Sequence, residues 1–243
     1  GSAKTFAVAA SADIIGNINF VICGDKESAA YFYNDLENIY EEKEVEYDKK
    51  RVLFYPTSYK RPYEPEKPDN TYILSRTEVL QRISTGDRKT IIVTYPEALS
   101  EKVITRKVMT NNSFKMSIGN SISMDELTDI LVNFNFEHVD YVVEPGQFTI
   151  RGGIVDVFSF ANDFPYRIEF FGDEVDSIRS FNPIDQLSIE KVRNIVLIPN
   201  LQNQNNNFEK ESLLQYIKNQ TIIWLDEEEC LKDKVDEEFN KAL

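Results

Sequence analysis

The sequence is poor in the residues that build metal centres and catalytic triads. It has one histidine, His138, and two cysteines, Cys23 and Cys230, which lie far apart and form no C-x-x-C pair. A structural zinc site needs four such ligands close together, and a triad needs a histidine with an orienting partner. We therefore expect no metal site, and we expect both cysteines to be buried thiols.

Long apolar runs and an excess of basic charge are also missing. The sequence contains no stretch of about 18 apolar residues that could cross a membrane, and it opens without the basic and apolar segments of a secretory leader. We therefore expect a cytoplasmic protein with no membrane partner. The formal net charge is −14, from 27 basic and 41 acidic residues. Because such a chain repels phosphates, free DNA is a poor candidate partner.

Apolar and aromatic residues are abundant enough for a folded core. The chain is 42% hydrophobic and has 16 Phe and 12 Tyr, which argues against disorder. In the first hundred residues, short β-branched stretches alternate with amphipathic ones, a pattern typical of βαβ units and a parallel sheet. We predict strands at residues 18–23, 52–55 and 90–94, and helices at residues 27–39 and 72–83.

Breaks in this pattern divide the chain into three segments. The prolines of residues 56–68 predict an ordered loop, and residues 111–113 interrupt the periodicity. Ser123 and Glu126 have the spacing of a capping box that opens a helix through Phe134. After Pro199, an asparagine-rich stretch precedes a predicted helix at 209–217 and a strand at 221–225. We predict that segments 1–112 and 200–243 form one domain and that 113–199 is a second, inserted domain.

The segment 145–181 reads as a small antiparallel sheet. Predicted strands at 147–151, 154–160, 166–171 and 175–181 are separated by glycine-containing turns. Side chains alternate between the two faces of a strand, so apolar residues that pack inward leave their neighbours outside. This alternation places Arg151, Arg167 and Phe171 together on the outer surface.

Two interpretations of this outer surface follow from the residues. Arginine beside an exposed aromatic is typical of protein-docking surfaces, since such residues bury large areas and bind carboxylates with two hydrogen bonds. Alternatively, the helix at 125–134 covers Phe171, and the arginines pair with Glu169 and Asp173 on a solvated face.

The motifs PGQFTIRGGIVDVF and PYRIEFFGDEVDSIRSF resemble the N-terminal UvrB-like module of the bacterial transcription-repair coupling factors, the Mfd family. The resemblance extends through VLFYPTSYKRPYEPEKPDN, Arg76 and TYPEAL to LLQYIKNQTIIWLDE. UvrB shares the central motifs, but UvrB and its close relatives carry a long tyrosine-rich hairpin that binds DNA. Residues 52–90 have room only for a loop and a helix, which favours the coupling factors.

The resemblance implies a fold, a partner and site residues. The fold is α/β, with a degenerate RecA/UvrB-like parallel-sheet domain and an inserted, smaller α+β domain that binds UvrA through an antiparallel sheet. By motif position, Arg151, Arg167 and Phe171 match the family's UvrA-binding residues. The full-length parent would be an ATP-dependent DNA translocase that binds stalled RNA polymerase and hands the lesion to nucleotide excision repair. An intramolecular contact with the parent's C-terminal region could occupy the same face.

Two fragments resemble parts of a nucleotide site. Residues Lys4 and Thr5 resemble the end of a P-loop, although Ala3 stands where glycine is expected, and Asp226 and Glu227 resemble a Walker B pair. We expect degenerate remnants without catalysis and without a cofactor in this chain, since phosphoryl transfer also needs a charge-stabilising arginine and a second lobe. ATP and Mg would serve the parent's motor. The rival hypothesis is a nucleotide-dependent DNA-remodelling domain of a UvrB-type helicase.

Overall fold

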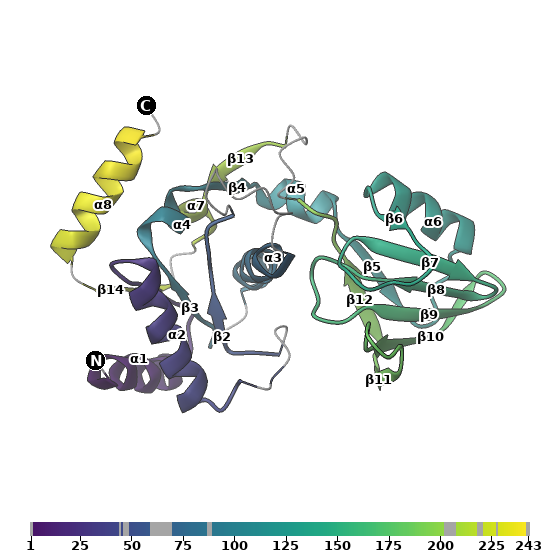
Figure 1. The fold of residues 1–243 in the computed structure, drawn as a ribbon, viewed down its shortest axis with the longest axis horizontal. Helices are drawn as coiled ribbons and strands as arrows, with labels where there is room; N and C mark the ends of the chain where they lie inside the picture. Colours follow the sequence, from purple (N-terminus) through teal and green to yellow (C-terminus); the bar gives the residue numbers. More distant parts are fainter. Residues whose placement is uncertain are drawn as a thin grey trace. The chain divides into compact units, whose positions relative to one another are not determined.

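The computed structural model describes residues 2–43, 45, 49–58, 70–86, 89–201, 208–217, 221–226 and 228–241. The chain divides into two compact units (Figure 1): unit 1 comprises Gly1–Arg106 and Phe208–Leu243, and unit 2 comprises Lys107–Asn207. Unit 1 is thus built from both ends of the chain. The domain boundaries expected at residues 112 and 199 differ from those of the two units and remain predictions.

Unit 1 is organised around a four-stranded parallel sheet. Its order is β14-β1-β3-β2, formed by Ile222–Leu225, Asn19–Ile22, Ile91–Thr94 and Val52–Phe54. All residues of β1 and β3 are buried, which explains why every residue of these strands except Asn19 is apolar or β-branched. The predicted fold class, with a parallel sheet in one unit and an antiparallel sheet in the other, is confirmed.

Helices surround this sheet. They are α1 (Ser2–Ile15), α2 (Lys26–Ile39), α3 (Asn70–Thr85), α4 (Pro96–Ser100), α7 (Leu213–Tyr216) and α8 (Glu228–Lys241), and α5 (Arg106–Asn111) lies where the chain passes into unit 2. Helix α2 packs on β2 and β3, and α3 packs on β2. The predicted strands near residues 18, 52, 90 and 221 and the helices near 27 and 72 are therefore confirmed within a few residues.

The helix predicted at residues 209–217 is wrong in its first half. Strand β13 (Lys210–Ser212) pairs there with β4 (Lys102–Ile104), and only α7 follows as a short helix. The partner strand lies about a hundred residues earlier in the sequence, so local periodicity could not reveal the pairing. Three other interpretations lie outside the described residues: most of the proline-rich loop, the asparagine-rich stretch 202–207, and the side chain of Cys230. Cys23 is buried, as expected.

Unit 2 contains a six-stranded sheet of order β11-β10-β9-β8-β7-β6. The strands are β6 (Glu137–His138), β7 (Gln147–Arg151), β8 (Ile154–Val157), β9 (Tyr166–Phe171), β10 (Glu174–Phe181) and β11 (Ser188–Lys191), antiparallel except for β6 with β7. A separate two-stranded ribbon joins β5 (Phe114–Ser117) to β12 (Asn194–Leu197). The hairpins β7–β8 and β9–β10 turn at Gly152 and Gly172, whose φ angles of 60° and 61° suit glycine.

One face of the six-stranded sheet builds the core of unit 2. Apolar residues of β7 to β10 pack there with Leu127 and Leu131 of helix α6 (Met124–Asn133). The predicted capping box is confirmed, because the Glu126 amide donates to the Ser123 hydroxyl and the Ser123 amide donates to the Glu126 carboxylate. The hydrogen bonds that the Ser123 amide and the Ser123 hydroxyl donate to the Glu126 carboxylate lower the pKa of Glu126. Since α6 covers the inner face, the residues that alternate with the core set lie on the opposite, outer face.

Candidate functional site

Strand register brings the predicted site residues onto the outer face of the six-stranded sheet. Arg151 pairs with Ile154 across β7 and β8, and Asp156 pairs with Arg167 across β8 and β9. Paired residues of an antiparallel ladder point to the same face. Phe171 lies on that face too, four residues after Arg167 and therefore about 13 Å further along β9. The predicted grouping of these positions on one face agrees with this geometry.

Asp156 holds the two arginines in place. Arg167 donates from Nε and Nη2 to the two carboxylate oxygens of Asp156, at 2.8 and 2.9 Å, and Arg151 donates from Nη2 to Oδ2 at 2.6 Å. The Asp156 side chain is 0% exposed. These hydrogen bonds raise the pKa of Arg167 above its usual value. A buried carboxylate requires such partners, so the three residues form one preorganised unit of net charge +1.

The two arginines differ in what they can offer a partner. The Arg167 side chain is 18% exposed: it stacks 4.6 Å from the ring centroid of the buried Phe181, and Nη1 donates to the Gln186 carbonyl at 3.4 Å. The Arg151 side chain is 44% exposed and makes a cation–π contact with Tyr141 at 5.6 Å. Arg151 therefore presents more of its guanidinium to solvent, whereas Arg167 also supports the fold.

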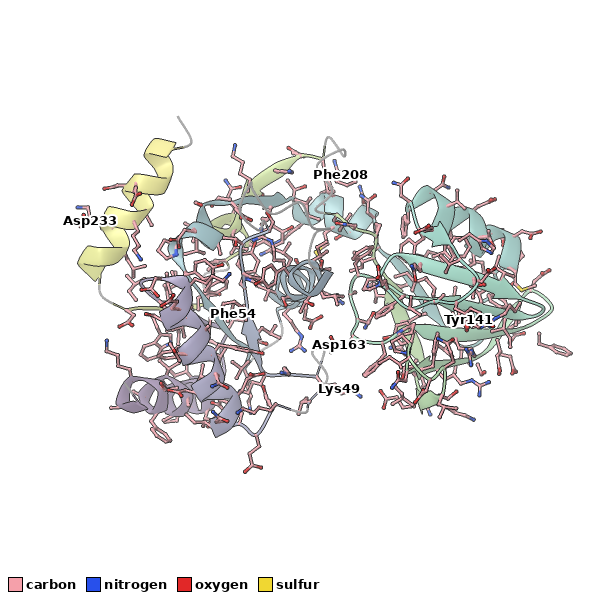
Figure 2. All side chains as sticks on the ribbon, in the orientation of Figure 1. Lys49, Phe54, Tyr141, Asp163, Phe208 and Asp233 are labelled. Atoms are coloured by element: carbon pink, nitrogen blue, oxygen red, sulfur yellow. The ribbon has the colours of Figure 1, made fainter. Side chains whose placement is uncertain are left out.

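Part of the outer face is covered by other side chains of unit 2. A second hydrophobic cluster of Val142, Phe158 and Phe181, with Val139 packed against it, lies at the end of the sheet where β10 finishes. Thr149, which pairs with Asp156 on this face, is buried. Tyr141, labelled in Figure 2, lies in the segment that contributes Val139 and Val142 to this cluster. The accessible part of the face therefore extends from Arg151 towards Phe171.

Phe171 is 83% exposed, so helix α6 does not cover it. The alternative interpretation is also wrong about the arginine partners, because Arg151 and Arg167 pair with Asp156. Glu169 pairs instead with Arg179 of β10 and accepts a 2.6 Å hydrogen bond from Ser177. That hydrogen bond, followed by the charge of Arg179, lowers the pKa of Glu169.

Basic charge is concentrated on this face. Residues 113–199 contain six basic and fourteen acidic residues. Register places four of the six basic residues on the outer face: Arg151, Arg167, Arg179 and Lys191. Asp156 and Glu169 lie between them. By the same register, Glu137 and Glu174 also lie on this face, opposite Gln147 and Phe171. Most of the basic residues of this acidic unit are thus gathered on one sheet face, where carboxylates accompany them and an exposed phenylalanine lies at the edge.

The nucleotide-like residues lie in unit 1. Lys4 of α1 forms a 2.5 Å ion pair with Asp226, which directly follows β14, so the structure brings these two residues together. Thr5 is buried, and Glu227 lies outside the described residues. Burial, reinforced by Asp226, raises the pKa of the nearby Cys23 thiol to about 12.

Two features of unit 2 escaped prediction. Asp156 was visible as a lone carboxylate in a strongly apolar strand, which is a signal that a buried cation partner is needed. Nothing in the local sequence indicated that Tyr141 stacks on Arg151, because that contact depends on the segment between β6 and β7 crossing the sheet. Among the described residues, no group of histidine, cysteine and carboxylate side chains could hold a metal ion. No helix in the described part of the chain is long and apolar enough to span a membrane.

Comparison with known proteins agrees with this architecture. Residues 114–202, nearly all of unit 2, match the family model of the UvrB interaction domain. The chain is 32% identical over 199 residues to the transcription-repair-coupling factor of Bacillus subtilis, which covers 82% of this chain and 16% of the relative. It is 33% identical to that of Myxococcus xanthus over 61% of the chain and 12% of the relative. The UvrABC system protein B of Thermosipho africanus is 26% identical over 82% of the chain and 31% of the relative.

Unit 2 is therefore similar to the UvrB interaction domain over nearly all of its length, and it is inserted into an α/β unit. The matches also confirm the resemblance of the chain to the transcription-repair-coupling factors. The chain spans about a sixth of the length of the Bacillus subtilis relative.

Proposed function

We propose that this chain is the recruitment module of a transcription-repair coupling factor and that the outer face of its six-stranded sheet binds UvrA. The parent protein would be an ATP-dependent DNA translocase that contacts RNA polymerase and DNA through other domains. In this proposal the module itself catalyses no reaction. It delivers nucleotide excision repair to a lesion at which transcription has stalled.

The observation that carries the proposal is that Arg151 and Arg167 are held by the buried Asp156 on the same sheet face as the exposed Phe171. Arg151 and Arg167 are fixed by Asp156, so little side-chain entropy remains to be lost on binding. Phe171 offers apolar area that no part of the described unit covers. Arginine and aromatic anchors dominate the binding energy of many interfaces. The net charge of +1 on the group of Arg151, Asp156 and Arg167 also selects an anionic partner surface and speeds its encounter.

The proposal predicts that Arg151→Ala raises the Kd for purified UvrA about tenfold, since a partly desolvated charged hydrogen bond contributes on the order of 1–2 kcal/mol. Isothermal titration at two salt concentrations checks this, and the loss should be smaller at high salt. Arg193→Ala is the matched control, because Arg193 is an exposed arginine of the same unit outside this sheet. Equal Kd values for the two variants and the unsubstituted chain would contradict the proposal.

The rival function, nucleotide-dependent DNA remodelling, would use Lys4 and Asp226. Lys4 and Asp226 form an ion pair with each other, and Thr5, the residue after Lys4, is buried. We therefore expect a flat equilibrium titration with fluorescently labelled ATP and Mg²⁺. Saturable binding that Lys4→Ala abolishes would favour the rival instead.

A further inference from the structure

A tight turn after β10 displays apolar side chains next to the arginine pair. In residues 182–187, the Asn182 amide donates to the Leu187 carbonyl at 2.9 Å, and the Gln186 amide donates to the Asn182 carbonyl at 2.8 Å. Side-chain oxygens of Asn182 and Asp185 accept from the Ile184 and Leu187 amides. The turn is therefore closed by its own hydrogen bonds and does not rely on its apolar side chains for support.

Gln186 fixes this turn onto the outer face. Its side-chain amide donates to the carbonyls of Val142 and Pro183, and its own carbonyl accepts from Arg167. Its φ angle is 62°, a left-handed conformation that a non-glycine residue adopts at some cost. Strained positions of this kind persist where the surroundings hold them and are concentrated at functional sites. The turn and the arginine pair thus belong to one continuous surface.

The turn holds its apolar side chains out into solvent. Ile184 is 91% exposed and Leu187 is 66% exposed, and Tyr141, which stacks on Arg151, is 63% exposed. Phe171 and the turn lie at opposite ends of the β9–β10 ladder, since Phe171 pairs with Glu174 at the start of β10 and the turn follows its last residue. The cationic centre of the face therefore has exposed apolar groups at both ends.

We propose that Ile184 and Leu187 form a second apolar anchor of the docking surface and that they bind the same partner as Arg151 and Phe171. This inference rests on the proposed function and extends it to the chemistry of the partner. The partner surface that fits is a carboxylate-bearing patch between two apolar hollows, one for Phe171 and one for Ile184. The turn is continuous with the arginine pair, and the arginine pair selects an acidic partner surface. We therefore assign the turn to the same partner.

The test is titration of UvrA into the chain carrying Ile184→Ala, Leu187→Ala or both. Backbone and polar side-chain hydrogen bonds close the turn, so these truncations leave its conformation and the thermal unfolding temperature unchanged. We expect Ile184→Ala to raise the Kd about tenfold and the double variant to raise it further. The matched control is Val132→Ala, a 57% exposed apolar residue of α6, on the other side of the sheet.

The possible outcomes separate this inference from the proposed function. If Arg151→Ala weakens binding while Ile184→Ala behaves like Val132→Ala, the docking surface stands and the second anchor is overturned. If the unsubstituted chain does not bind UvrA, both proposals fail together. Light scattering of the chain without UvrA tests whether the turn binds a second copy of the chain instead. A concentration-dependent dimer that Ile184→Ala dissociates would assign the turn to that contact and overturn the inference.

Discussion

Replacing Asp156 with alanine is expected to destabilise unit 2 by about 2–3 kcal/mol and to abolish most UvrA binding. Removing one member of a buried ion pair typically costs about 3–5 kcal/mol, because the remaining charge loses its partner. The lower value is expected here because Arg167 and Arg151 are 18% and 44% exposed, so water can partly replace the carboxylate. Urea unfolding with an unchanged m-value measures the first effect, and titration with UvrA measures the second.

A double-mutant cycle tests whether Asp156 acts through the arginines. If it positions Arg151 for the partner, Asp156→Ala and Arg151→Ala together weaken binding less than the sum of their separate effects. Asp156→Asn is the control for shape, since the amide keeps one acceptor oxygen and loses the charge. Binding by Asp156→Ala at the unsubstituted Kd, in folded protein, would show that the aspartate only supports the sheet.

The sequence predicted the strands and helices of the chain better than it predicted which of them pair in space. Strands β7 and β9 begin and end where the alternation predicted, because a two-residue period and a following glycine turn are both local signals. The pairing of β13 with β4 has no local signal, and the stretch around Leu213 was therefore predicted as a longer helix. Residues that close a sheet from a distant part of the chain are the kind that periodicity misses.

The same limit applies to the docking face. Alternation indicated that Arg151, Arg167 and Phe171 share a face, but the strand order β7-β8-β9 decides which carboxylate lies between the arginines. Glu169 and Asp173 were the partners in the alternative interpretation, whereas Asp156 is the partner in space. The stacking of Arg167 on Phe181 also depends on packing at the end of β10, which the local sequence does not indicate. The sequence therefore predicted which residues share a face of the sheet but not which groups hold them there.

Replacing Phe171 with alanine is expected to raise the Kd for UvrA roughly 30-fold, equivalent to about 2 kcal/mol, without lowering stability. The large loss in binding is expected because an aromatic anchor buries most of its area against the partner. The unchanged stability follows from its exposure of 83%, since the side chain gives up little contact within the folded chain. Calorimetric titration and thermal unfolding of the same preparation measure both quantities.

Phe171 and Ile184 lie at opposite ends of the β9–β10 ladder, and this separation supplies a sharper test. Side chains that lie far apart and touch no common residue usually contribute additively, so the free-energy losses of Phe171→Ala and Ile184→Ala should sum in the double variant. Val132→Ala should change neither quantity. A loss in the double variant no larger than that of Phe171→Ala alone would mean that the partner reaches only one end of the face. A loss equal to the sum would show one partner spanning the cationic centre.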